Sequence, residues 1–319
     1  MTKIHFHSDC PFFAGCENMI ANFLNSQEFH SGYSISFSFA YSDAYIKGFK
    51  FRVNRDISLY PIKFFDLTNF FNLSQSYPVL LQRIINELVR IILGFPLMIY
   101  EVIYLYRLFK KINPKILHLN NGGYPAARSV LAASLAGKLC RVPSIIMVVN
   151  NMALGYKNYS RWFDLPIDRL VAKSVNCFVT GSKAAAKQLQ LVLSLPDSKI
   201  RSIYNGIQIR ESSKTILSSK KRLGIEKFEG VIFGVVAQLI PRKGHQVLLD
   251  AVLQLSKSNQ PLNFLILIEG TGHLYENLLK FVDENQLQKK VVFVGHEDNI
   301  VDFMSVLDVL ILPSIRDED

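Results

Sequence analysis

A basic pair that follows an apolar strand has the clearest chemical meaning in this sequence. The strand is expected at Val231–Val236, and Arg242, Lys243 and Gly244 come directly before a helical pattern. Anions bind well at such a junction, because unpaired backbone N–H groups and the helix dipole both face the ligand. A lysine fixed there can neutralise a diphosphate and stabilise it as a leaving group. The competing interpretation is an exposed basic pair at a turn.

A glycine-containing turn follows one β–α unit later. Leu265–Gly272 is a second apolar run, and Gly270 and Gly272 stand at its end. Glycine has no Cβ, so its backbone can approach a ligand closely. Together with Lys243, this turn predicts a site for a phosphorylated ligand, and a nucleotide is the favoured class.

Polar residues and a glycine also end apolar stretches in the first half. Gly15 follows the first strand candidate and would let a ligand approach, whereas Glu17 would either line a cleft or complement a helix dipole. His118 ends another strand candidate and points to the same expected cleft, although a buried structural histidine is the alternative. Asn205 and Gly206 form either a hinge turn or a loop that lines the cleft.

Other chemistries lack their signatures. The sequence has no P-loop, no His-Glu-x-x-His and no Gly-x-Ser-x-Gly motif. No zinc-finger or RNA-binding motif is present, so nucleic acid is not an expected partner. The cysteines form no CxxC pair and no cluster with histidine, so we expect no metal site and a reducing compartment. These cysteines are Cys10, Cys16, Cys140 and Cys177.

Length and composition set the scale of the protein. A chain of 319 residues is comfortable for two domains, and 49% hydrophobic residues against 19% charged residues allow a sizeable core. The net charge of +10 favours acidic partners such as nucleotides or anionic lipid. The first ten residues lack the apolar core of a signal peptide, which favours a cytoplasmic location.

Apolar strand candidates alternate with amphipathic helices in both halves of the chain. This order predicts α/β domains with parallel sheets covered on both faces. The polar stretch Gln208–Lys227 separates the halves, so we place the domains at 1–205 and 206–319. Their sheet edges would surround one cleft. Strands are expected near 4–7, 35–40, 57–60, 116–119, 144–149, 177–180, 200–204, 231–236, 264–268, 291–294 and 309–312. Helices are expected near 17–25, 126–138, 167–173, 183–192, 246–257, 274–286 and 300–306.

The segment Val79–Lys111 departs from this alternation because it is long, aromatic and apolar. Gly94 and Pro96 are expected to kink it. A membrane-spanning helix needs about 20 largely uncharged residues, and five charged residues interrupt this segment. Two interpretations stay open: a pair of interfacial amphipathic helices, or helices packed on the sheet. The basic end with Lys110 and Lys111 suits the surface of an anionic membrane.

Taken in order, these stretches resemble the retaining glycosyltransferases of family 4, which have the GT-B fold of two Rossmann-like domains facing a cleft. The resemblance covers nearly the whole chain, is strongest in Ile203–Glu318 and is thin across residues 30–115. The matching stretches are Gly15-x-Glu17, Ile203–Ile207, Lys243-Gly244, Glu269–Gly272, Val292–Gly295 and Leu312–Ser314 followed by Glu318.

The resemblance implies a nucleotide-diphosphate sugar as donor on the second domain and an acceptor on the first. It implies that Lys243 contacts the donor diphosphate and that Glu318, as the first glutamate of a Glu-x7-Glu motif, lies near the transferred sugar. The family transfers the sugar with retention of configuration and needs no obligatory metal or other cofactor. The further donor-binding residues are Gly15, Gln238, Arg242, Gly270 and Gly272.

The chain departs from the family pattern in several places. Ala14 stands where the family often has a first glycine, and Gln238 replaces an arginine that Arg242 would partly substitute. Asn150 stands where a cleft histidine is frequent; it can bond a sugar hydroxyl but cannot shuttle a proton. The second glutamate of the motif is absent before the end at Asp319, so we expect a truncated chain with an incomplete second domain.

The leading hypothesis is a transferase that acts on a lipid-linked or polysaccharide acceptor, in cell-envelope polysaccharide biosynthesis. Peripheral contact with the inner membrane face would run through Val79–Lys111. A nucleotide-sugar epimerase on the same fold is the second hypothesis. An inactive, truncated binding subunit is the third.

Overall fold

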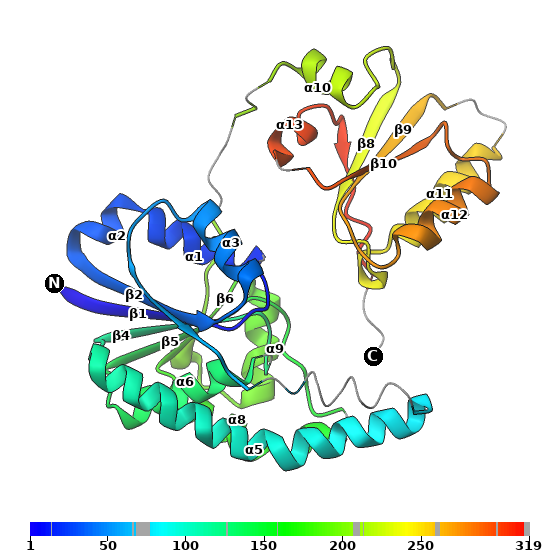
Figure 1. Cartoon of the computed structure of the whole chain (residues 1–319). Coiled ribbons are helices and arrows are strands. Elements are labelled where there is room, and N and C mark those ends of the chain that lie inside the picture. The colour runs from blue at the N-terminus through cyan, green and yellow to red at the C-terminus, as the bar shows by residue number, and fades with distance from the viewer. Residues whose placement is uncertain are drawn as a thin grey trace. The chain divides into compact units, whose positions relative to one another are not determined.

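The computed structural model of the chain consists of two compact units, 1–208 and 209–319 (Figure 1). The predicted boundary between 205 and 206 lies just before this division. The structure describes residues 1–13, 15–65, 67, 77–125, 127–157, 159–206, 211–212, 214–258, 262–297 and 299–315.

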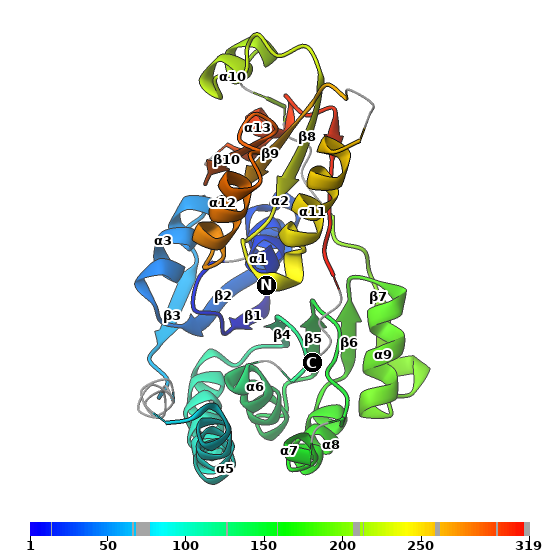
Figure 2. The ribbon, with the colours of Figure 1, turned by 90° about the vertical axis from the view of Figure 1, so that its right-hand side faces the viewer.

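Unit 1 is built on a seven-stranded parallel sheet with the order β3-β2-β1-β4-β5-β6-β7, which Figure 2 shows strand by strand. The order reverses between β1 and β4, so the connections lie on opposite faces and leave a crevice at the carboxyl edge. The strands are β1 (Thr2–Ser8), β2 (Tyr33–Ala40), β3 (Ser58–Ile62), β4 (Ile116–Asn121), β5 (Ser144–Val149), β6 (Cys177–Thr180) and β7 (Ile200–Ser202).

Helices cover both faces of this sheet (Figure 2). On one face, apolar side chains of α1 and α3 pack against β1 and β2. On the other, α5, α6, α8 and α9 pack against β4, β5 and β6. The described helices are α1 (Gly15–Asn25), α2 (Gln27–Gly32), α3 (Asp43–Arg52), α5 (Val79–Ile112), α6 (Arg128–Leu139), α7 (Tyr159–Trp162), α8 (Leu165–Ser174), α9 (Lys183–Leu193) and the 3₁₀ turn η1 (Asp197–Lys199).

Helix α3 was not predicted, although its start carries a local signal. The Ser42 hydroxyl accepts the Tyr45 N–H at 3.0 Å, and Asp43 stands in the first turn. Serine at this position satisfies a helix N–H that has no partner within the helix. Tyr45 and Phe49 then fill the core beside Phe37. The weak apolar periodicity of α3 explains why the helix was missed.

Helix α5 corrects the prediction of a helix pair. Its 34 residues form one continuous helix through Gly94 and Pro96. Pro96 removes one backbone hydrogen-bond donor, yet the residues on both sides of it remain helical. Among the described helices, α5 is long and apolar enough to cross a membrane by length and composition. We had expected its charges to exclude a membrane-spanning helix, and they do not. Its fully buried residues begin only at Met98, where the second half joins the core.

Unit 2 contains a smaller parallel sheet with the order β10-β9-β8-β11. Side chains of α11 and α12 pack on one face, and those of α13 pack on the other. The predicted α/β class is therefore confirmed in both units. The elements are α10 (Ile216–Arg222), β8 (Val231–Val236), the 3₁₀ turn η2 (Pro241–Lys243), α11 (His245–Ser256), β9 (Phe264–Glu269), α12 (Tyr275–Glu284), β10 (Val291–Gly295), α13 (Ile300–Met304) and β11 (Val309–Leu310).

Candidate functional site

The loop with Lys243 lies at the carboxyl edge of the unit 2 sheet. Lys243 ends η2 and is half-buried, and Gly244 follows with φ +69°. A Cβ added to Gly244 would lie 2.0 Å from the carbonyl oxygen of Pro313, so no other residue fits without a shift. The Ile315 N–H also donates to the Arg242 carbonyl at 3.0 Å. The loops that follow β8 and β11 are therefore packed against each other.

The predicted glycine turn lies against the same loop. The Leu239 N–H donates to the Thr271 carbonyl at 2.9 Å. A Cβ on Gly270 would lie 2.0 Å from the Ala237 oxygen, and one on Gly272 would lie 2.3 Å from the Leu239 oxygen. Both glycines are thus required where two backbones meet, a structural reason for them that the sequence did not reveal.

Basic and polar groups surround the start of α11. Gln238 and Arg242 are exposed, and α11 begins at His245, directly after Lys243 and Gly244. His245 is buried, and neither ring nitrogen has a hydrogen-bond partner among the described residues. Burial, and then the charge of Lys243, lowers the pKa of His245. The predicted combination of a cation and a helix N-terminus is present, whereas Glu318 lies outside the described residues.

The loop after β10 completes this edge, and its contacts were not predicted. Glu269 at the end of β9 is buried and accepts the Glu297 N–H at 3.1 Å. Glu297 in turn pairs with Arg222 of α10 at 2.5 Å. The carboxylates therefore fix the loop rather than present themselves as catalytic groups.

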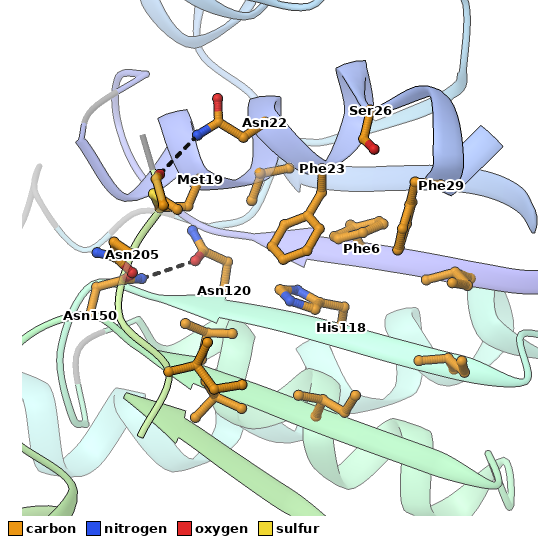
Figure 3. Close-up of a pocket in the computed structure, with 18 of the residues that line it drawn as sticks. Phe6, Met19, Asn22, Phe23, Ser26, Phe29, His118, Asn120, Asn150 and Asn205 are labelled. Carbon is orange, nitrogen blue, oxygen red and sulfur yellow. Dashed lines mark hydrogen bonds between the residues drawn. The ribbon is translucent and has the colours of Figure 1, made fainter. Parts of the chain in front are cut away.

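His118, Asn150 and Asn205 line one pocket of unit 1, with a volume of about 820 Å³ (Figure 3). Its wall is largely apolar: the His118 ring packs against Phe6 and Phe23 at centroid distances of 4.7 and 5.8 Å. Burial lowers the pKa of His118 to about 4, so its ring is neutral at pH 7. The ring is partly exposed to the pocket, and its Nδ1 has no hydrogen-bond partner among the described residues, so His118 forms a neutral part of the pocket wall.

Glu17 lies beneath this pocket and not on its surface. The carboxylate is 1% exposed and accepts hydrogen bonds from the Ser8 hydroxyl at 2.9 Å and from the Asn120 amide at 3.3 Å. Asn120, which the sequence did not single out, also accepts from Asn150 at 3.0 Å. Glu17 therefore positions Asn120. The prediction that Glu17 itself lines the cleft is corrected. A Cβ on Gly15 would meet nothing within 4 Å among the described neighbours, so sterics do not require glycine there.

A second pocket of about 1070 Å³ opens at the carboxyl ends of β1, β2 and β3, between α5, α6 and α8. Glu101 of α5 accepts both the Nε and Nη2 of Arg128 on its Oε1, at 2.9 and 2.7 Å. Its Oε2 has no hydrogen-bond partner among the described residues, and burial raises the pKa of this carboxyl. On another side, Arg90 bonds Asp164 at 3.1 Å. These pairs could not be predicted from the sequence, because their members are far apart in the chain.

A buried hydrogen-bond chain leads from the core of unit 1 to this second pocket. Ser129 donates to Asp9, so its oxygen must accept from Nε2 of His7 at 3.2 Å. Nδ1 of His7 then accepts from Ser38, whose oxygen is 2.8 Å from His5. With neutral rings, donor counting gives both histidines the tautomers that direct their protons toward Asp9. Burial supports this, because it lowers the pKa of each to about 3.

The described residues contain no group of three or more histidine, cysteine, aspartate or glutamate side chains that could hold a metal ion. All four cysteines are free thiols.

Two family models match the chain in succession. The model described as Glycosyltransferase Family 4 matches residues 68–211, and the model described as Glycosyl transferases group 1 matches residues 219–319. Together they span most of the chain, one in each unit.

A curated relative from Escherichia coli is a UDP-Gal:alpha-D-GlcNAc-diphosphoundecaprenol alpha-1,3-galactosyltransferase. It is 21% identical over 225 residues, which cover 67% of this chain and 56% of the relative. The chain thus spans about half the length of this relative.

Solved structures match both units. A structure of Anabaena Alr3699/HepE with UDP and glucose has a TM-score of 0.68 at 15% identity and covers 97% of this chain and 73% of that one. A glycosyltransferase from Rickettsia africae has a TM-score of 0.69 at 14% identity, with 98% and 73% covered. These similarities agree with a GT-B fold. The two successive family matches and this fold lead to one conclusion: over residues 68–211 and 219–319 the chain is similar to the glycosyltransferases of family 4 and of group 1.

Proposed function

We propose that this protein transfers a sugar from a nucleotide-diphosphate sugar to a lipid-linked or polysaccharide acceptor, with retention of configuration. The observation that carries the proposal is the carboxyl edge of the unit 2 sheet. There the Lys243 loop, the Gly270–Gly272 turn and the start of α11 lie together. This is an anion site of the kind that a diphosphate requires.

The donor would bind mainly to unit 2. The Lys243 ammonium and the N–H groups at the start of α11 would hold the diphosphate and stabilise the charge that develops as it leaves. Arg242 and Gln238 would add contacts from the exposed side of the same loop. Glu318 would lie near the transferred sugar, and Gly15 would contribute from unit 1. We infer a uridine donor, because the E. coli relative is named for UDP-Gal and the Anabaena structure holds UDP. This scheme needs no metal or other cofactor.

The acceptor would bind to unit 1 as a lipid-linked saccharide, the class for which the E. coli relative is named. Asn150 and Asn205, whose carboxamides line the 820 Å³ pocket, would bond sugar hydroxyls. His118 would serve as a neutral wall of that pocket.

Helix α5 would bring the enzyme to its lipid substrate. Its outer face exposes Leu88, Ile92 and Phe95 by 52, 63 and 59%, at the spacing of one helix face. Its second half packs in the core, which favours a helix that lies along the membrane over one that crosses it. Lys110 and Lys111 at its end suit anionic lipid. We therefore propose a cytoplasmic, peripheral protein of the inner membrane face that acts in polysaccharide biosynthesis of the cell envelope.

Replacement of Lys243 tests the donor site. We expect Lys243→Ala to lower kcat/KM for transfer from UDP-galactose to diphosphoundecaprenol-linked N-acetylglucosamine by about 10²–10³-fold, because one fixed charge at the leaving group is lost. Lys257→Ala is the matched control, since Lys257 caps the opposite end of the same helix and is exposed. Unchanged turnover and UDP affinity in Lys243→Ala would refute the assignment.

Two assays separate the alternative functions. An epimerase would convert the nucleotide sugar to an epimer without any acceptor, which product analysis by NMR detects. A binding subunit would bind UDP in calorimetry but would release none from the nucleotide sugar.

A further inference from the structure

Two of the four cysteines lie together where β1 leads into α1. Cys10 follows the end of β1 by two residues, and Cys16 is the second residue of α1. Both thiols are free and partly buried, and a hydrogen bond joins their side chains. Two sulfur atoms in hydrogen-bond contact need only a small movement to reach the bonding distance of a disulfide, about 2.05 Å. The pair is therefore placed to form one.

The two thiols differ in acidity because their neighbours differ. The Cys16 thiol donates to Oε2 of Glu17 at 2.8 Å. The hydrogen bond with Cys10, burial and the charge of Glu17 all raise the pKa of Cys16. The hydrogen bond with Cys16 lowers the pKa of Cys10, and this effect outweighs burial and the charge of Glu17. Cys10 is thus the thiol that ionises first, and Cys16 is the one that keeps its proton.

Cys10 is also the thiol that a small oxidant can reach. It lines the 1070 Å³ pocket together with Pro11, and the exposed Phe12 follows. The Phe12 backbone N–H bonds to Cys10 and favours its ionised form. A thiolate is the form of cysteine that attacks a peroxide. Cys10 therefore combines the access and the ionisation that this reaction needs.

The other two cysteines have different surroundings. The Cys140 thiol donates to the Tyr106 carbonyl at 3.4 Å, and the Cys177 thiol donates to the Phe178 carbonyl at 3.7 Å. Burial raises the pKa of each. Both are partly buried, as Cys10 and Cys16 are, so they serve as internal controls for reactivity.

We propose that Cys10 and Cys16 are a redox-active dithiol, which a peroxide converts to an intramolecular disulfide. The Cys10 thiolate attacks one peroxide oxygen, the O–O bond breaks, and the other oxygen leaves as water with the proton that Cys10 had released. This step leaves a sulfenic acid on Cys10. The Cys16 sulfur then attacks the Cys10 sulfur, and the hydroxyl leaves with the Cys16 proton as a second water. Two thiols are oxidised and one peroxide is reduced.

Oxidation would change the hydrogen bonds of Glu17. A disulfide removes the Cys16 proton, so Glu17 loses that donor and keeps Asn120 as a partner. Asn120 accepts from Asn150, which lines the 820 Å³ pocket. The redox state of the dithiol is thereby linked to this pocket. The inference goes beyond the proposed function and does not depend on it.

Mass spectrometry of the whole chain after digestion tests the proposal. The tryptic peptide Ile4–Lys47 contains both cysteines and no internal lysine or arginine, whereas Cys140 and Cys177 fall in separate peptides. The reduced protein is treated with hydrogen peroxide, quenched with N-ethylmaleimide and digested. We expect Ile4–Lys47 to lose two hydrogen atoms and take up no maleimide, while the other two cysteines remain alkylated. Dithiothreitol should restore both thiols.

Single replacements assign the order of attack. Cys16→Ser should retain a sulfenic acid on Cys10, which dimedone traps. In Cys10→Ser, Cys16 should be oxidised at least tenfold more slowly than Cys10 is in the wild type, because little thiolate is present. Cys177→Ser is the matched control and should form the disulfide at the rate of the wild type. A thermal melt of each variant verifies the fold, and the wild-type result stands without the variants.

Three results would overturn the proposal. The first is a wild type whose Ile4–Lys47 peptide still takes up two maleimides, or whose four thiols react at similar rates. The second is a disulfide between two chains in place of the internal one, which a non-reducing gel reveals. The third is a Cys10→Ser variant in which Cys16 reacts as fast as Cys10 does in the wild type.

Discussion

The Ser129 hydroxyl donates to the Asp9 carboxylate at 2.6 Å, across 120 residues of sequence. The bond joins the start of α6 to the end of β1 and closes the buried chain that passes through His7 and Ser38. Because each hydroxyl has one proton, the carboxylate sets the direction of every donor behind it. One partly buried carboxylate thereby fixes the tautomers of two neutral core histidines.

The buried histidines should make unit 1 sensitive to acid. The folded-state pKa values of His5 and His7 are lowered from 6.5 to about 3, so the unfolded chain binds protons first as the pH falls. Their contribution to stability is present above about pH 6.5 and is lost toward pH 3, by about 1.4 kcal/mol per pH unit for each histidine. Urea unfolding at pH 7 and pH 5 measures this slope. His7→Asn should reduce it, and equal slopes in the wild type and this variant would contradict the prediction.

Removal of Arg128 should destabilise unit 1 in a pH-dependent way. Arg128→Ala leaves Glu101 as a buried carboxylate without its cation, which costs about 3–5 kcal/mol at neutral pH. Burial already raises the pKa of Glu101, and the loss of Arg128 raises it further. The variant should therefore regain stability relative to wild type as the pH falls and Glu101 takes up a proton. Chemical denaturation from pH 8 to pH 5 measures the difference in free energy of unfolding between wild type and variant. A difference that does not change with pH would argue against the Arg128–Glu101 ion pair.

Gly244→Ala should destabilise unit 2 by at least about 2 kcal/mol, because the new Cβ meets the Pro313 carbonyl in a left-handed backbone conformation. Denaturation monitored by circular dichroism measures the loss. Gly15→Ala is the control, since its Cβ meets no described atom within 4 Å, and it should change stability by less than about 0.5 kcal/mol. Equal stabilities for the two variants would show that the loop contact is unimportant.

The exposed face of α5 should be needed for membrane binding. Ile92→Glu should weaken binding to vesicles of phosphatidylglycerol and phosphatidylethanolamine by at least tenfold, because it places a charge in the apolar face. Leu191→Glu makes a similar change on α9, where the leucine is 72% exposed, and should leave binding intact. Co-sedimentation with the vesicles provides the measurement. Similar losses in both variants would point to a general charge effect.

The loops that gather Lys243 and Gly270 could be predicted because parallel strands share one carboxyl edge. Once Val231–Val236 and Phe264–Glu269 are recognised as neighbouring buried strands, the residues that follow them must lie close together. The same rule brought His118 and Asn150 into one pocket. The rule does not predict that Glu17 lies beneath this pocket, because the burial of Glu17 depends on the side chains around it.

The sequence by itself determined the two α/β units, because apolar runs of strand length between amphipathic helices can be buried only in parallel sheets. Tertiary structure alone decided that Val79–Ile112 is one helix and that Asp9, Glu101 and Arg128 line one pocket. The physical reason is range: periodicity and turn signals act over a few residues, whereas these contacts join segments 27 to 120 residues apart.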